Sequence, residues 1–159
     1  MKLVIQRVSS ASVRADGRVV GEIALGFLVL VGAVSGDTAA DAEEAARKVA
    51  SLRVFDDAAG KMNLSLADVG GAALVVSQFT LAADLSRGRR PGFERALPGR
   101  DAAPLYERFV SALAAQGVPV ATGVFGATMQ VTLVNEGPAT FLLDVTAAGS
   151  ATPQGSPSR

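Results

Sequence analysis

The sequence predicts a single mixed α/β domain in which two main helices pack on a mostly antiparallel β-sheet. Runs of β-branched, aromatic and apolar residues recur in pairs separated by short turns, which is typical of antiparallel strands. Two segments show the apolar spacing of an amphipathic helix. A doubly wound parallel sheet would need a more regular alternation of strands and helices. We expect residues 1–145 to form this domain and residues 146–159, which are small, polar and contain Pro, Gly and Ser, to form a disordered tail.

The composition narrows the chemistry that the chain can perform. With 159 residues, 49% of them apolar, the chain is long enough for one domain with a substantial core. Its 15 Lys and Arg balance 15 Asp and Glu, so no net charge draws the whole molecule to nucleic acid. The chain has neither Cys nor His. This excludes disulfides, thiolate nucleophiles and Ser-His-Asp arrangements, and it removes the commonest zinc ligand. We therefore expect no metal and no cofactor.

The start of the chain does not look like a targeting segment. Met1–Val8 lacks the long apolar region and small-residue cleavage site of a signal peptide. The longest apolar run, Gly26–Val34, is too short to span a bilayer. We expect a soluble cytoplasmic protein.

Strands are expected along most of the chain. Asp16-Gly17 is a strong hairpin signal because both residues tolerate positive φ, and it is flanked by the runs Ala11–Arg14 and Arg18–Ile23. Gly26–Val34 is apolar on both faces and is interpreted as a central buried strand. The full set of expected strands is Lys2–Val8, Ala11–Arg14, Arg18–Ile23, Gly26–Val34, Arg53–Phe55, Ala72–Phe79, Val118–Phe125, Met129–Val134 and Thr140–Val145.

Two helices complete the prediction. In Thr38–Leu52 the alanines and Val49 fall on one helical face, with Thr38 as the capping residue. Asp101–Gln116 carries a comparable apolar stripe, and we expect Asp101 to cap its start and Gly117 to end it.

Asn135–Phe141, with Gly137-Pro138 at its centre, separates two runs that otherwise look like adjoining strands. A Gly-Pro pair removes one backbone donor and permits a cis bond. Two interpretations stay open at this point. The stretch is either an ordinary turn between strands or a rigid backbone device aimed at a ligand.

Ser77–Leu81 follows the second buried strand with no turn residue between them. Alternation places Ser77, Phe79 and Leu81 on one face, and Gln78 and Thr80 on the other. The last N–H groups of a strand can bind a carbonyl oxygen or an anion, although Ser and Thr also end strands simply by local hydrogen bonding. Thr80 is an awkward nucleophile, because no His or nearby Lys would accept its proton.

The segment Ser86–Phe93, followed by Arg95 and Arg100, is the one basic cluster. Arginines beside an aromatic ring can bind phosphates and stack on a base. The alternative is a solvated loop of scattered charges. If the segment binds RNA, its contacts are expected from Arg87, Arg89, Arg90 and Phe93.

Taken together, Ser77-Gln-Phe-Thr-Leu81 and Asn135-Glu-Gly-Pro-Ala-Thr140 resemble the two signature motifs of the D-aminoacyl-tRNA deacylases. The resemblance continues in register from residue 1 to about residue 145. Further segments that are similar to the family are Gln6–Ser9, Gly60–Leu64, Gly88–Pro91 with Phe93, Pro104–Phe109 and Phe125–Val131.

The resemblance implies a homodimeric deacylase-type fold that hydrolyses the ester of D-aminoacyl-tRNA, and of glycine mischarged on tRNA-Ala, while rejecting L-aminoacyl-tRNA. It implies catalytic roles for Ser77, Gln78, Phe79 and Thr80, largely through their backbone. It also implies a cis Gly137-Pro138 bond whose carbonyls enter the partner's pocket and exclude L side chains. Met129 is expected to pack against this turn, and Arg7 to brace it.

The sequence departs from the usual family pattern at three positions. Ala139 stands where Val is common, Leu85 where Thr is frequent, and Ala82 where an aromatic residue is frequent. None of them touches the expected backbone contacts, so they bear on fine substrate preference more than on activity. Two other classes of function stay open: an RNA-binding module without catalysis, and a metal-dependent hydrolase, which the missing His and Cys disfavour.

Overall fold

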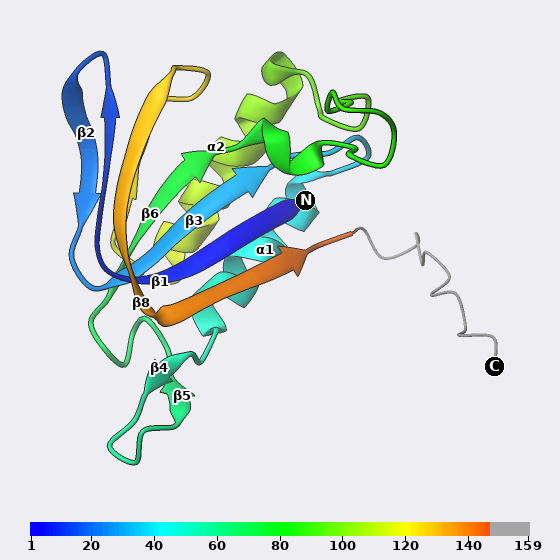
Figure 1. The fold of residues 1–159 in the computed structure, drawn as a ribbon. Helices are drawn as coiled ribbons and strands as arrows, with labels where there is room; N and C mark the ends of the chain where they lie inside the picture. Colours follow the sequence, from blue (N-terminus) through cyan, green and yellow to red (C-terminus); the bar gives the residue numbers. More distant parts are fainter. Residues whose placement is uncertain (147–159) are drawn as a thin grey trace.

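The computed structural model describes residues 1–146 and shows a curved β-sheet with two helices on one face (Figure 1). The main sheet has the order β2-β1-β3-β6-β7, with β8 also paired to β1, and β4 and β5 form a separate two-stranded hairpin. The strands are β1 (Lys2–Ala15), β2 (Arg18–Ile23), β3 (Gly26–Gly32), β4 (Phe55–Asp56), β5 (Met62–Leu64), β6 (Ala72–Ser77), β7 (Val120–Thr122) and β8 (Met129–Asp144). The helices are α1 (Ala39–Ser51), the short 3-10 helix η1 (Phe79–Ala82) and α2 (Gly99–Ala115).

The predicted mixed α/β fold with two main helices is confirmed. Strand β1 is antiparallel to β2, β3 and β8, whereas β3–β6 and β6–β7 are parallel pairs. The hairpin between β1 and β2 turns at Asp16 and Gly17, which both have positive φ, of 49° and 74°. These are the dihedral angles that the Asp-Gly signal predicts.

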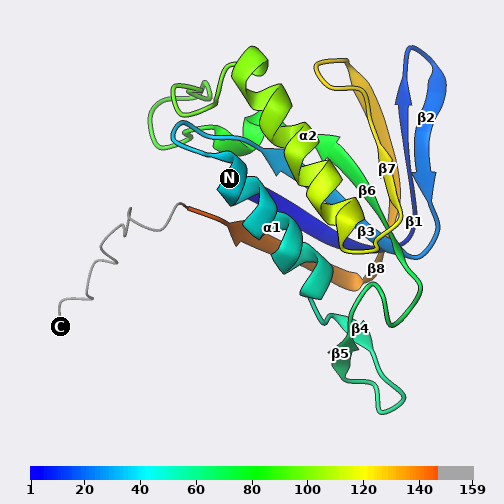
Figure 2. The ribbon, with the colours of Figure 1, turned by 180° about the vertical axis from the view of Figure 1, so that it is seen from behind.

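Helices α1 and α2 lie side by side across one face of the sheet (Figure 2), and the main core fills the space between this helical layer and the sheet. Val49 of α1, Phe109 of α2 and Phe27 of β3 are completely buried there. Each such side chain contributes roughly 1.5–3 kcal/mol through its removal from water. Ala73 and Val75 of β6 belong to the same core, which packs β6 against α2.

The two helices begin differently. Thr38 caps α1 as predicted and forms a capping box, in which its side chain and that of Asp41 each accept a backbone N–H at the other residue. In α2 the prediction of Asp101 as cap is wrong, because the capping position belongs to Pro98, which has no side-chain hydrogen bond, and Asp101 lies in the first turn. A carboxylate in the first turn still interacts favourably with the helix dipole. Gly117, at φ 84°, follows the end of α2 as expected.

A second, smaller core lies on the other side of β3 and β6, inside the curve of the sheet. Leu28, Leu74 and Val13 are buried in it. The curve brings β2 close to β7, since a Cβ added to Gly21 would lie 2.5 Å from the carbonyl oxygen of Thr122. Glycine at position 21 therefore permits a backbone contact that any side chain would block.

Several predicted elements have other bounds. Strand β3 ends at Gly32 rather than at Val34, and β4 covers Phe55–Asp56 rather than Arg53–Phe55. Strand β7 covers only Val120–Thr122 of the predicted Val118–Phe125. The strand predicted to continue from β6 to Phe79 ends at Ser77, and Phe79–Ala82 turns into η1. The alternating faces predicted for Ser77–Leu81 are therefore wrong beyond the end of β6.

The two strands predicted around Asn135–Phe141 are one strand, β8, so of the two interpretations of this stretch the ordinary turn between separate strands is wrong. Both halves of β8 pair with β1: Met129 lies opposite Ala15 and Asp144 opposite Lys2. The register shifts opposite Arg7, between the pairs Gln6–Thr140 and Val8–Asn135, so the Gly-Pro segment is an irregularity inside a continuous strand. The sequence shows the two hydrophobic runs, but only pairing with a single long partner joins them.

The tail predicted to be disordered, residues 146–159, lies outside the described residues except for Thr146. Within the described part of the chain, no helix has the length and apolar character needed to cross a membrane.

Candidate active site

A cavity of about 570 Å³ opens where β6 ends, between η1, the start of α2 and the beginning of β8. The parallel strands β3 and β6 both point their carboxyl ends at it, which is a common place for a ligand in sheets of this kind. The residues that line it are mostly apolar: Met1, Val31, Ala33, Val76, Ser77, Gln78, Phe79, Ala96, Leu97, Pro98, Gly99, Ala102, Tyr106, Phe125, Gly126, Ala127, Met129 and Val131.

The wall of the cavity contains the first predicted signature. The N–H of Gln78 still donates to the carbonyl of Val31 at 2.8 Å, so the sheet ladder holds the chain up to this residue. The carbonyl of Gln78 then accepts the N–H of Leu81, which starts η1. The N–H groups of Phe79 and Thr80 belong to the first turn of η1, where no earlier carbonyl of the same helix can accept them.

Thr80 does not line the cavity, and its hydroxyl is already engaged by Gln78, whose Nε2 donates to Thr80 Oγ1. Among the lining side chains only that of Tyr106 is titratable. No side chain in the wall is therefore placed to act as a general base at neutral pH. Both the sequence, which offers Thr80 no nearby base, and the position of its side chain outside the cavity therefore disfavour Thr80 as a nucleophile.

Tyr106 is held in place rather than free to react. Its hydroxyl donates to the carbonyl of Val75 at 2.9 Å, and its ring lies 5.6 Å from that of Phe125. Burial raises the pKa of Tyr106 to about 12, because the phenolate would lose its hydration.

Met1 also lines the cavity, and its amino terminus is held by buried hydrogen bonds. Its α-ammonium donates to Asp37 Oδ1 and to the carbonyl of Val145, each at 2.5 Å. Asp37 Oδ2 also accepts the N–H of Val34, so one carboxylate ties the start of β1 to the segment after β3.

Aromatic side chains mark the mouth of the cavity. Phe79 is 59% exposed although it is large and apolar, and its ring centroid lies 5.2 Å from that of Phe93. This pair joins the cavity to the basic segment that runs from Asp84 to Arg95. Met129 lines the opposite wall.

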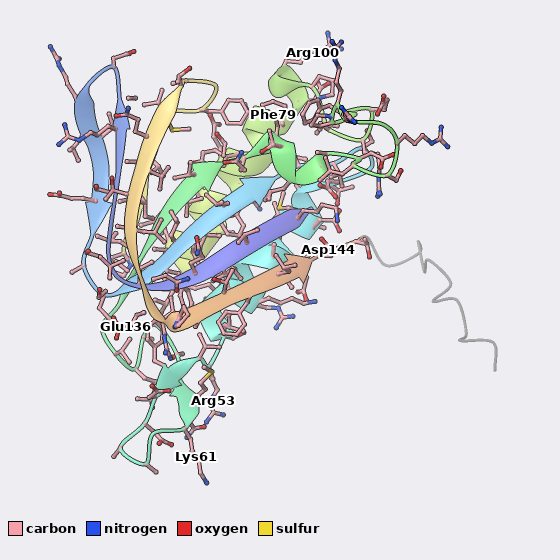
Figure 3. All side chains as sticks on the ribbon, in the orientation of Figure 1. Arg53, Lys61, Phe79, Arg100, Glu136 and Asp144 are labelled. Carbon is pink, nitrogen blue, oxygen red and sulfur yellow. The ribbon has the colours of Figure 1, made fainter. Side chains whose placement is uncertain are left out.

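The second signature lies elsewhere in the same chain. The Gly137-Pro138 bond is cis, as predicted, and both residues are exposed. Figure 3 shows the neighbouring Glu136 beside the β4–β5 hairpin, at the far end of the sheet from Phe79. Met129 and Gly137 are eight residues apart on one extended strand, a separation of about 26 Å. Within one chain, Met129 and Gly137-Pro138 therefore do not form a common site.

Several hydrogen bonds define the path of this segment. Arg7 is buried, and its Nε donates to the carbonyl of Glu136 at 3.1 Å while its Nη1 donates to the carbonyl of Val54 at 2.6 Å. From within β8, Asn135 Oδ1 accepts the N–H of Ala139 at 3.1 Å. The segment is thus tied both to β1 and to the chain that leads into β4.

The structure brings Ser77, Gln78, Phe79 and Met129 into one cavity, and Phe93 contacts the ring of Phe79. Gly137 and Pro138 lie elsewhere, in β8, where Arg7 of β1 donates to the carbonyl of the neighbouring Glu136. Sequence reasoning missed Tyr106, Phe125 and Met1 as wall residues. A signal for Tyr106 existed, because it is spaced three and seven residues from the buried Phe109 and Leu113 and so falls on the inner face of α2. No local signal indicates that Met1 reaches the cavity.

Comparison with known proteins places this geometry in a family. The family model described as D-Tyr-tRNA(Tyr) deacylase matches residues 4–144. The D-aminoacyl-tRNA deacylase of Ruegeria pomeroyi is 58% identical over 145 residues, which are 91% of this chain and all of the relative. That of Thermomicrobium roseum is 59% identical over 144 residues, covering 91% of this chain and 94% of the relative.

Solved structures agree with these matches. A structure described as c-Myc DNA unwinding element binding protein is 38% identical, with a TM-score of 0.86, and the match covers 92% of this chain and all of the other. A probable eukaryotic D-amino acid tRNA deacylase shares the fold at 18% identity and a TM-score of 0.80, covering 91% of this chain and 98% of the other. The chain therefore belongs to the D-Tyr-tRNA(Tyr) deacylase family.

Proposed function

We propose that this protein hydrolyses the ester bond of D-aminoacyl-tRNA and releases free tRNA and the D-amino acid. The single observation that carries the proposal is the family match over residues 4–144, with relatives called D-aminoacyl-tRNA deacylase at 58–59% identity. The cavity bounded by Ser77, Gln78 and Phe79 is the site to which we assign the reaction. Such an activity would serve translation quality control, and we expect it in the cytoplasm.

The reaction is assigned to backbone groups and to the substrate itself. The ester of an aminoacyl-tRNA is already activated by its α-ammonium group and by the neighbouring ribose hydroxyl. Backbone N–H groups at Phe79 and Thr80 would stabilise the oxyanion, and one such donor is worth roughly 3–4 kcal/mol. Correct positioning of the ester supplies on the order of 7–11 kcal/mol more. The support for this mechanism is the absence of a general base among the side chains of the cavity wall.

In this mechanism the ribose 2′-hydroxyl of the terminal adenosine helps to activate the attacking water. A substrate that ends in 2′-deoxyadenosine tests this step, and we expect its hydrolysis to be much slower. Hydrolysis of the deoxy substrate at the normal rate would contradict the mechanism while leaving the activity intact.

Chiral selection is assigned to Gly137 and Pro138 of the partner subunit in a homodimer. Their carbonyls would capture the substrate's α-amino group and leave no space for an L side chain. The proposal is supported by the exposure of both residues and by their distance from the cavity of their own chain. In this arrangement Met129 packs against the partner's turn, and Arg7 braces the turn within its own chain.

The outer face of β8 supports an interface between two copies of the chain. Leu142 is 82% exposed and Val134 is 54% exposed, on either side of the Gly-Pro segment. Such large apolar side chains on an edge strand usually mark an interaction surface. Sedimentation of the protein at micromolar concentration should show a dimer, and a monomer that still cleaves its substrate would refute the shared site.

The activity and its selectivity can be tested in one assay. The protein is incubated with D-Tyr-tRNA, L-Tyr-tRNA and glycyl-tRNA-Ala, with and without a chelator. We expect cleavage of the D ester and the glycyl ester in both conditions, because glycine has no side chain to exclude, and rejection of the L ester. Equal cleavage of the L and D esters would contradict chiral selection, and loss of activity with chelator would favour a metal-dependent hydrolase.

A nucleic-acid-binding module without catalysis is the second candidate. It is favoured by the basic segment around Arg87, Arg89 and Arg90, and by the likeness to a solved structure called c-Myc DNA unwinding element binding protein. This candidate predicts salt-dependent binding to many nucleic acids and no ester hydrolysis in the same assay.

A further inference from the structure

The segment Asp84–Gly92, which we call the arginine loop, is a closed and ordered loop. Asp84 and Gly92 exchange both backbone hydrogen bonds, at 2.8 and 2.9 Å. Inside this bridge, Asp84 Oδ1 accepts the N–H of Ser86 at 2.9 Å, and Gly88 turns the chain at φ 68°. Figure 1 shows this connection looping out between η1 and α2, beyond the carboxyl ends of β3 and β6. The loop therefore presents its side chains from a defined backbone.

The three arginines of this loop have no carboxylate partner among the described residues, a property that they share with Arg14, Arg18, Arg53, Lys61 and Arg95. Arg7, Arg47, Lys48 and Arg108 all form ion pairs, whereas Arg87, Arg89 and Arg90 form none within residues 1–146. All three are exposed.

Two carboxylates, those of Asp84 and Glu94, lie within the sequence of the loop and the residues that follow it. The contacts with Ser86, and the nearby charge of Arg95, lower the pKa of Asp84, which therefore stays ionised and engaged with its own loop. Glu94 adds one more carboxylate next to Gly92. Residues 84–95 still carry four arginines against two acidic side chains, a local excess of two positive charges in a chain with no net charge.

The loop adjoins the cavity through the ring contact between Phe93 and Phe79. Arg90 is three residues from Phe93, so their Cα atoms are separated by at most about 10 Å. A stacked nucleic-acid strand advances roughly 3.4 Å per nucleotide. The guanidinium groups therefore stand within a few nucleotides of whatever nucleoside occupies the cavity.

We propose that the arginine loop binds the phosphates of the single-stranded 3′ end of the substrate tRNA, immediately before the terminal adenosine. This inference rests on the function proposed above, in which the terminal adenosine lies at the cavity. Arginine suits the role because its planar guanidinium donates two parallel hydrogen bonds to a phosphate. The contacts read charge and not sequence, so they hold any tRNA in register for the cavity.

The test compares a double variant, Arg89→Gln with Arg90→Gln, with a control that removes the same charge elsewhere. The control, Arg47→Gln with Lys48→Gln, lies on the exposed side of α1, where both side chains pair with Glu44. Each protein is assayed on three D-tyrosyl esters, those of adenosine, of the trinucleotide CCA and of whole tRNA, at several salt concentrations.

We expect the arginine variant to lower kcat/KM about ten-fold on the trinucleotide and on tRNA, and to leave the adenosine ester unchanged. The slope of log kcat/KM against log salt should decrease in magnitude by about 1.4, because each single-strand phosphate contact contributes roughly 0.7. The control variant should match the wild type on all three esters.

Three results of this assay would overturn the inference. An equal loss on the adenosine ester would mean that the loop shapes the cavity. A loss on tRNA alone would place the contacts on the acceptor stem, and a similar loss in the control would indicate a long-range field.

If the wild type cleaves none of the esters, the proposed function fails separately. Fluorescence anisotropy with a labelled CCA trinucleotide that carries no amino acid then tests the loop directly. Equal binding by the wild type and the arginine variant would refute the proposed phosphate contacts.

Discussion

The guanidinium of Arg7 on β1 and the carbonyl of Glu136 on β8 are joined by a hydrogen bond of 3.1 Å at the point where the register of the two strands shifts. The same side chain reaches the carbonyl of Val54 at 2.6 Å. A contact with Asp56 at 3.5 Å adds little, because that carboxylate is about half exposed. A buried arginine thus satisfies two backbone acceptors from segments that are distant in sequence.

Replacing Arg7 should weaken the fold and the placement of the Gly-Pro segment together. Arg7→Gln leaves the buried Val54 carbonyl and the partly buried Glu136 carbonyl without this donor, and we expect a loss of about 2–4 kcal/mol in the free energy of unfolding. Urea denaturation measures this loss. Arg14→Gln, an exposed position on the same strand, is the control and should change stability by less than about 0.5 kcal/mol. Equal effects of the two substitutions would show that Arg7 braces nothing.

Gly137→Ala should be more damaging than an alanine at a comparable glycine. Gly137 has φ 121°, and an added Cβ would lie 2.6 Å from Arg7 Nη2. Gly60→Ala is the matched control, since Gly60 also has positive φ, 72°, but an added Cβ there meets nothing within 4 Å. We expect Gly60→Ala to cost about 1–2 kcal/mol and Gly137→Ala clearly more. Identical thermal shifts for the two variants would contradict the crowding against Arg7.

Thr80 should be dispensable as a hydroxyl. Its Oγ1 is bound by the Gln78 amide, and it does not line the cavity. We predict that Thr80→Val keeps substantial deacylation activity, because its backbone N–H is retained. Thr80→Ser is the companion variant that keeps the hydroxyl. If the Ser variant were active and a well-folded Val variant inactive, the side chain would be the nucleophile after all.

Tyr106→Phe should reveal the titration of a buried phenol. At pH 8 the loss of the hydrogen bond to Val75 should cost about 1 kcal/mol. Folding raises the pKa of Tyr106 from 10.0 to about 12, so its stabilising contribution is complete below pH 10 and is lost as the pH rises from 10 toward 12. The stability difference between wild type and variant, measured by urea unfolding, should therefore shrink between pH 10 and pH 12. A constant stability difference over that range would show that folding does not raise the pKa of Tyr106.

Local features of the fold could be predicted because their causes are local. The capping box at Thr38 and the turn at Asp16-Gly17 depend on residues within four positions of one another. The capping prediction for Asp101 failed because Pro98 begins α2 one turn earlier. The alternation predicted through Ser77–Leu81 failed for a different reason: β3 ends at Gly32, so the chain after Ser77 has no strand to follow and coils into η1.

By itself, the sequence determined the fold class, the two helices, the two signature motifs and the exclusion of His- and Cys-based catalysis. The tertiary structure decided that the two motifs lie at opposite ends of one sheet, that β8 is continuous through Gly137-Pro138, and that Arg7 of β1 donates to the carbonyl of Glu136 beside that pair. Spacing along a chain reports which residues share an element. Which elements meet depends on pairing and packing between segments more than a hundred residues apart, and no local pattern records that.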